Sequence, residues 1–163
     1  HEMEENGIPD TPTGRDLKKV ANALQESGSY SGALDMDFRG FARIYEYMNS
    51  LGARYRYACY LVMVTMDTIS DQTMYMENIE QALDCMEKSI RQKIRKVDIC
   101  TRYSAMQYLI ILFEPEESQI PKVMERIFMQ YYKMYEKNDF KPGYEYIPML
   151  GKKKDIPDGN SKI

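Results

Sequence analysis

The chain has a single histidine, and it is the first residue, His1. Histidine is the side chain that titrates near neutral pH, and it is the commonest metal ligand in proteins. Its absence from the rest of the chain excludes histidine triads, histidine metal sites and histidine general bases. Any catalytic chemistry would therefore depend on carboxylates, lysine, tyrosine or cysteine.

Cysteine is also scarce, with Cys59, Cys85 and Cys100 lying far apart in apolar segments. The odd number and wide spacing predict buried free thiols in a reducing cytoplasm rather than disulfides or a metal site. No apolar run approaches the roughly 20 residues of a membrane span, and this sequence shows no signal-peptide pattern, so we expect no membrane partner. The first residue is His1 rather than Met, which indicates an excised fragment or a tag remnant.

The balance of charge excludes another class of partner. Lysine and arginine number 22 and aspartate and glutamate 25, which gives a net charge of −3 and a pI near 5.3. This balance offers no electrostatic reason to bind nucleic acid. With 163 residues, 44% hydrophobic and 29% charged, the chain is long enough for one domain with a substantial core and one additional helix or tail.

The two ends of the chain are predicted to lie outside this domain. Residues 1–12 contain proline and glycine among acidic residues, as is typical of a linker. Thr13 is a suitable cap for a helix from about Arg15 to Glu26, so residues 13–29 are interpreted as a connecting helix with one narrow apolar face. The lysine-rich residues 151–163 are predicted to be a flexible tail.

Residues 30–150 are predicted to form an α+β domain. A short edge strand at 32–38 precedes a helix that ends near Ser50, with Gly52 at its C′ position. Apolar residues 57–66 predict a strand that is covered on both faces or lies at the sheet centre. The clearest helical period follows, and its members are Ile79, Leu83, Met86, Ile90, Ile94 and Val97.

Strands at 98–103 and 107–113 then form a hairpin with its turn at Ser104-Ala105. Pro121 lies in the first turn of another helix, and 143–149 is a last strand. From residue 57 onward the order is βαββαβ, which is the ferredoxin-like plan of an antiparallel sheet with helices on one face. A strand and helices precede it.

The hairpin, preceded by a long amphipathic helix ending in Arg95-Lys96-Val97-Asp98, resembles the GGDEF domain of diguanylate cyclases. The resemblance covers roughly residues 30–149 and is strongest over 90–113. It implies a nucleotide cyclase-like palm fold. In that family two GTP molecules are condensed into cyclic di-GMP, and the turn reads Gly-Gly-Asp/Glu-Glu-Phe.

The family's turn residues are replaced in this chain. The corresponding five residues are Ser104, Ala105, Met106, Gln107 and Tyr108. Carboxylates supply hard oxygen ligands to Mg²⁺, whereas a thioether and a neutral amide do not. The family's Asp-x-Asp corresponds to Thr65-Met66-Asp67, which keeps only its second acid. We therefore interpret these positions as a vestigial active site with no catalytic residue, metal or cofactor.

Arg95 and Asp98 match the family's inhibitory Arg-x-x-Asp site, which binds cyclic di-GMP. A guanidinium can donate to a guanine edge or a phosphate, and a carboxylate can accept from guanine N–H groups. The simpler interpretation is structural, because a cation suits a helix C-terminus and an aspartate can cap the turn that follows. Both interpretations are kept, and the structural one is preferred.

The sequence thus predicts an inactive GGDEF-like module of a bacterial signalling protein, such as a two-component response regulator. The resemblance implies an upstream receiver or sensor domain, and a homodimer is a further candidate. Two alternatives remain: a cyclic di-GMP effector that uses Arg95 and Asp98, and residual GTP binding or cyclase activity. The arginines around the first domain helix are interpreted as a solvated face beside Asp37 and Glu46, with a protein or phosphate contact as the alternative; they are Arg39, Arg43, Arg54 and Arg56. Tyr131, Tyr132, Met134 and Tyr135 would mark a protein interface if exposed together.

Overall fold

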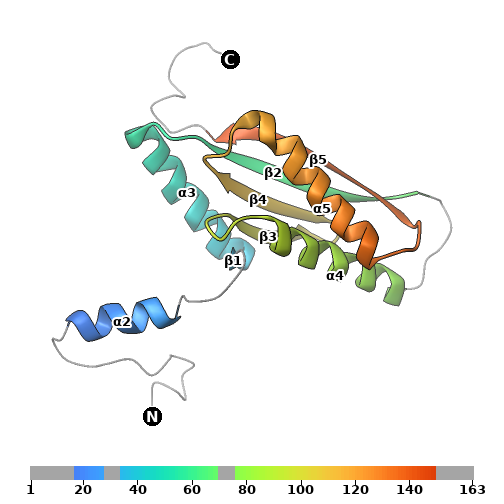
Figure 1. Ribbon diagram of the computed structural model, residues 1–163, viewed down its shortest axis with the longest axis horizontal. Coiled ribbons are helices and arrows are strands. Elements are labelled where there is room, and N and C mark those ends of the chain that lie inside the picture. The colour runs from blue at the N-terminus through green and yellow to red at the C-terminus, as the bar shows by residue number, and fades with distance from the viewer. Residues whose placement is uncertain (1–16, 28–33, 70–75, 150–163) are drawn as a thin grey trace. The chain divides into compact units, whose positions relative to one another are not determined.

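The computed structural model describes residues 17–27, 34–69 and 76–149 (Figure 1). The chain divides into two compact units, residues 1–31 and 32–163, and each is described by itself. The predicted linker at 1–12 and the predicted tail at 151–163 lie outside the described residues.

The first unit contains one described helix, α2 (Leu17–Ser27). The predicted helix start near Arg15, with Thr13 as its cap, lies outside the described residues. Leu17 is 77% exposed and Leu24 69% exposed, so the apolar face of α2 is largely uncovered within its own unit. Most of the stability of a short amphipathic helix comes from packing of such a face.

The second unit is built on a five-stranded sheet with the order β1-β3-β4-β2-β5. Strand β2 is antiparallel to both β4 and β5, β3 is antiparallel to β4, and only the short β1 is parallel to its neighbour, β3. The strands are β1 (Leu34–Asp35), β2 (Cys59–Thr68), β3 (Ile99–Ser104), β4 (Gln107–Phe113) and β5 (Phe140–Met149). The edge strand predicted at 32–38 is confirmed as the two-residue β1, and the apolar strand predicted at 57–66 is confirmed as β2, which lies between β4 and β5 while β4 is the central strand.

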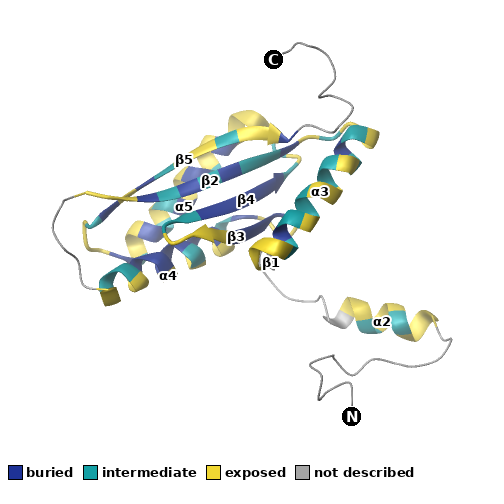
Figure 2. Cartoon of the chain, turned by 180° about the vertical axis from the view of Figure 1, so that it is seen from behind, coloured by how far each residue is buried: buried dark blue, intermediate teal, exposed yellow. Residues whose placement is uncertain are grey.

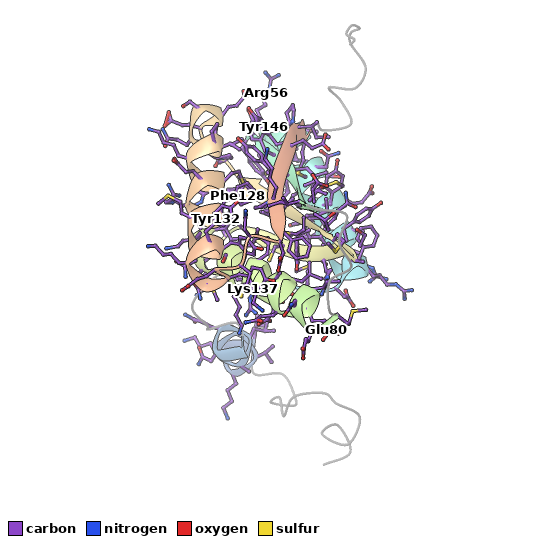
Figure 3. All side chains as sticks on the ribbon, turned by 90° about the vertical axis from the view of Figure 1, so that its right-hand side faces the viewer. Arg56, Glu80, Phe128, Tyr132, Lys137 and Tyr146 are labelled. Carbon is purple, nitrogen blue, oxygen red and sulfur yellow. The ribbon has the colours of Figure 1, made fainter. Side chains whose placement is uncertain are left out.

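Helices cover both faces of this sheet. Helices α4 (Met76–Lys93) and α5 (Ile120–Met134), the latter preceded by the 3₁₀ turn η1 (Glu117–Gln119), pack on one face, and α3 (Phe38–Tyr55) packs on the other. Figure 3 shows α5 and α3 on opposite sides of the sheet. The ferredoxin-like βαββαβ arrangement with an additional N-terminal strand and helix is therefore confirmed.

Side-chain alternation along β4 divides the core between the two faces. Tyr108, Ile110 and Leu112 face α4 and α5, whereas Leu109 and Ile111 face α3. All five are buried, which explains why this strand reads as apolar almost throughout. Figure 2 shows the buried residues concentrated on β2 and β4, in the middle of the sheet.

The structure corrects two predicted helix ends. Helix α3 continues through Gly52 to Tyr55. Arg56 is its C-cap and, with a φ of 63°, adopts the left-handed backbone conformation. Its N–H donates to the Gly52 carbonyl at 2.8 Å. Gly52 is buried, and a Cβ there would lie 3.1 Å from the Tyr57 carbonyl oxygen, so glycine favours the close approach of the returning chain rather than the helix end.

The second correction concerns Val97, which was assigned to the apolar face of α4. The helix ends at Lys93, and Val97 is 56% exposed in the turn before β3. That turn is closed by the Asp98 N–H, which donates to the Arg95 carbonyl at 2.9 Å. The helical spacing at Val97 is therefore coincidental.

The three cysteines are buried and form no disulfide, as predicted. Burial raises the pKa of the Cys59 and Cys85 thiols, which disfavours the reactive thiolate. No helix in the described part of the chain is long and apolar enough to cross a membrane.

Candidate functional site

The hairpin turn consists of Ala105 and Met106, one residue later than predicted, because Ser104 still pairs with Gln107. Two-residue hairpin turns usually need positive φ angles, which glycine supplies. Among the described non-glycine residues only Arg56 and Glu114 have a positive φ, so this turn is of a different type. The pairing shifts between Arg102 and Ser104, and such a bulge changes the local twist directly before the turn.

Two hydrogen bonds hold the turn in place. The Arg102 side chain donates from Nη2 to the Ala105 carbonyl at 3.1 Å, and the Met66 N–H donates to the Met106 carbonyl at 2.9 Å. The hairpin end is thus fixed from β3 and from β2, although it lacks the glycines of the family's turn.

Thr65 and Gln107, predicted as separate parts of a vestigial site, are cross-strand partners of β2 and β4. The Gln107 Nε2 donates to Thr65 Oγ1 at 3.2 Å and lies 3.2 Å from Met63 Sδ. The Ser104 hydroxyl donates to Gln107 Oε1 at 2.9 Å. A neutral amide therefore joins β2, β3 and β4 at the point where the resemblance expects carboxylates.

Asp67 lies two residues beyond Thr65 on the same face of β2 and opposite Lys141 of β5. It is exposed, and it is the only carboxylate among the seven residues assigned to the vestigial site. Within the described residues no group of three or more His, Cys, Asp or Glu side chains is placed to hold a metal ion. This part of the site offers hydrogen bonding but no cluster of hard anionic ligands.

Unlike the other residues of the vestigial site, Tyr108 is part of the hydrophobic core. Its side chain is 2% exposed and points to the α4 face, where its hydroxyl donates to the Leu83 carbonyl at 2.7 Å. The guanidinium of Arg102, on the neighbouring strand β3, lies 5.7 Å from the centre of the Tyr108 ring. Tyr108 therefore belongs to the core that joins β4 to α4.

We expect Gln107→Ala to lower the free energy of unfolding by about 1 kcal/mol, since it removes a part-buried hydrogen bond to Thr65 and an exposed one from Ser104. Thr65→Val should cost a similar amount, and the double variant should cost less than the sum. Urea denaturation of the two single variants and the double variant measures this coupling. Additive effects would mean that the two side chains do not interact.

Arg95 and Asp98 lie together at the other end of β4, where α4 turns into β3. Asp98 is 1% exposed, and its carboxylate accepts from the Arg95 N–H at 2.8 Å and the Phe113 N–H at 2.9 Å. The Arg95 side chain donates to both carboxylate oxygens at 3.2 Å and also to the Phe113 carbonyl. The pair thus connects the end of α4 to the end of β4, as the structural interpretation predicts.

A cavity of about 320 Å³ lies beside this pair, between α4, the end of β4 and α5. Its charged lining includes Lys93, Arg95 and Arg126 as well as Glu114 and Glu116. The sequence analysis missed Lys93 and Arg126. No local spacing relates Arg126 to Arg95, because only the packing of α5 against α4 brings them to one cavity.

A second cavity, of about 360 Å³, is apolar and lies between α3 and the sheet. Leu61, Met63 and Leu109 of the sheet form its floor, and Tyr45 of α3 and Tyr103 of β3 are among its other lining residues. The same floor residues also line a smaller hollow, of about 220 Å³, that reaches Ile147 of β5. The α3 face of the sheet is therefore only partly covered.

No protein-family model matches the sequence, and no curated protein matches it significantly. Solved structures do match. A DGC protein from Thermotoga maritima is 15% identical with a TM-score of 0.57, over 73% of this chain and 87% of that one. The active GGEEF domain of a diguanylate cyclase from Vibrio cholerae is 16% identical with a TM-score of 0.58, over 68% and 74%.

A third match is the GGDEF domain of FimX from Pseudomonas aeruginosa, 10% identical with a TM-score of 0.57, over 71% of this chain and 76% of that domain. At these identities the likeness concerns the fold alone. The chain therefore has the fold of the GGDEF domains of diguanylate cyclases.

Proposed function

We propose that this chain is a catalytically silent GGDEF-like module that acts in signalling through protein contacts. The observation that supports the proposal is the Gln107 amide, bonded to Thr65 and Ser104 where metal-binding carboxylates would be needed. Stabilising the charge of a reacting triphosphate requires cations held by such ligands. Asp67 alone, exposed at the edge of this region, does not supply a two-cation site.

The context of the module is part of the same proposal. We assign it to a bacterial cyclic di-GMP or two-component pathway, with a receiver or sensor domain upstream of residues 13–29. A diguanylate cyclase, SiaD from Pseudomonas aeruginosa, has been solved in complex with its activator SiaC, so a protein of this fold does take a protein partner. The coding sequence upstream of this chain tests the receiver-domain assignment directly.

Incubating the chain with GTP and Mg²⁺ or Mn²⁺ should give no cyclic di-GMP when the products are separated by chromatography. A competent diguanylate cyclase under the same conditions serves as the control. Any cyclic di-GMP above the protein-free background would contradict the proposal and favour the alternative of residual activity.

A second candidate function is cyclic di-GMP binding, favoured by the cavity that brings Lys93 and Arg126 beside Arg95. The GGDEF domain of DgcB from Caulobacter crescentus, another match in fold, has been solved in complex with c-di-GMP. Guanidinium groups suit both phosphates and guanine edges. Asp98, however, is buried and already accepts four hydrogen bonds from Arg95 and Phe113.

Calorimetry with cyclic di-GMP decides this alternative. If the cavity binds the ligand, the wild type gives heat and Arg126→Ala reduces the affinity about tenfold or more. Arg126 is exposed on α5, so its replacement leaves the Arg95–Asp98 pair intact and is preferable to replacing Asp98. An absence of heat with the wild type rules this function out.

A further inference from the structure

Three arginines lie in one line along the solvent side of α3. Arg39, Arg43 and Arg54 are exposed, and at 100° per residue they fall within a narrow arc of the helix. We call them the arginine stripe. Tyr47, 63% exposed, and the exposed Glu46 lie between Arg43 and Arg54 on this side, so the stripe carries three cations and one acid. Within the described part of the chain no carboxylate forms an ion pair with any of the three.

The position of Arg39 is electrostatically unfavourable for the helix itself. It lies in the first turn of α3, which contains no acidic residue, and the N-terminus of a helix carries a positive partial charge. The Asp37 carboxylate, which caps the helix by accepting from the Gly40 N–H at 2.8 Å, is the one local compensation. Folding of α3 therefore does not explain why cations occupy this end.

A complementary surface lies on the opposite face of the sheet. Glu77, Glu80 and Asp84 are exposed along the first half of α4, again within a narrow arc. We call them the acidic stripe, and Figure 3 shows Glu80 pointing outward from α4. Lys88 pairs with Asp84 at 3.0 Å. The other two acids of this stripe, Glu77 and Glu80, form no ion pair with a described residue.

The spacing of the two stripes is compatible with direct pairing. Arg39 and Arg43 are separated by one turn, a rise of about 6 Å, and Glu77 and Glu80 by about 4.5 Å. Arginine and tyrosine are among the residue types that contribute most to protein interfaces, and the arginine stripe presents both. The acidic stripe offers the carboxylates that arginine binds best.

We propose that the arginine stripe of one copy docks on the acidic stripe of a second copy of this chain. The two stripes lie on α3 and α4, on opposite faces of the sheet, so the contact is heterologous and each copy keeps one stripe of each sign for another neighbour. In this proposal the protein partner of the signalling module is a second copy of the chain, and the proposal rests on the signalling role described above. The cyclase assay tests the proposed function separately, so the two can fail independently.

Sedimentation velocity of the whole chain over a range of concentrations tests the proposal. The wild type should self-associate at low ionic strength and dissociate near 1 M salt, where the Debye length is only about 3 Å. Arg39→Glu with Arg43→Glu should weaken association about tenfold or more, and Glu77→Lys with Glu80→Lys should do the same. Mixing these two double variants should restore association, because each supplies the stripe that the other lacks.

Lys122→Glu with Lys133→Glu, which reverses two exposed cations on α5, is the matched control and should leave association unchanged. A chain that stays monomeric at every concentration overturns the proposal. Association that survives both stripe reversals also overturns it, and would point to a contact through another surface, such as the exposed leucines of α2.

Discussion

Asp98→Ala is expected to lower the free energy of unfolding by about 3–4 kcal/mol. The Asp98 carboxylate is 1% exposed and satisfies the N–H groups of Arg95 and Phe113 together with the Arg95 guanidinium. Alanine would leave buried backbone donors without an acceptor and a cation without its partner, and each such loss is costly. The cost should be high because one side chain connects the ends of α4, β3 and β4.

Denaturant unfolding of three variants separates these contributions. Asp98→Asn keeps one acceptor oxygen but presents an NH₂ group to a donor, so its effect should be somewhat smaller than that of alanine. Arg95→Ala should cost only about 1 kcal/mol, because the Arg95 side chain is 55% exposed and the two backbone N–H groups still bind Asp98. A loss below 1 kcal/mol in Asp98→Ala would contradict the structural role.

The fold was predictable from the sequence for those helices and strands that bury only one of their faces. The apolar positions of α4 recur at steps of three and four because a single side of that helix packs on the sheet. The same pattern failed at Val97, because periodicity carries no information about where a helix stops. The prediction that Gly52 ends the helix failed for a related reason. The close contact at Gly52 is with the Tyr57 carbonyl, and it forms only after the chain has turned back.

The candidate site was predictable in its members but not in its contacts. Thr65 and Gln107 were assigned to one site on the resemblance, yet their direct pairing depends on the register of β2 against β4. Tyr108 was assigned with its neighbour Gln107, although adjacent residues of a strand face opposite sides of a sheet. Arg126 could not be found from the sequence, because its place in the cavity results from the packing of α5.

Raising the pH from about 10 to 12 is expected to reduce the free energy of unfolding by about 2 kcal/mol or more. Burial, followed by the hydrogen bond and charge of Asp139, raises the pKa of Tyr135 to about 12. Burial also raises the pKa of Tyr131 well above its usual value of 10. Between pH 10 and 12 the unfolded chain loses these protons and the folded chain keeps them, so stability falls as pH rises. Below pH 10 both states are protonated, and the full stabilisation is present.

Two single-atom replacements should distinguish the two tyrosines. Among the described residues the buried Tyr131 hydroxyl has no hydrogen-bond partner, so Tyr131→Phe should leave stability at pH 7 unchanged or raise it by up to about 1 kcal/mol. Tyr135 donates to Asp139 at 2.5 Å, and Tyr135→Phe should cost about 1–2 kcal/mol.

In both variants the free energy of unfolding should fall less between pH 10 and 12 than in the wild type, because each variant removes one buried hydroxyl that must stay protonated in the folded chain. The free energy of unfolding, measured in urea between pH 7 and pH 12 for the wild type and both variants, tests the signs together. Equal destabilisation by the two replacements at pH 7 would show that the Tyr131 hydroxyl has a partner after all. An alkaline loss as steep in the variants as in the wild type would place its origin in the other tyrosines whose pKa burial raises, such as Tyr57 and Tyr60.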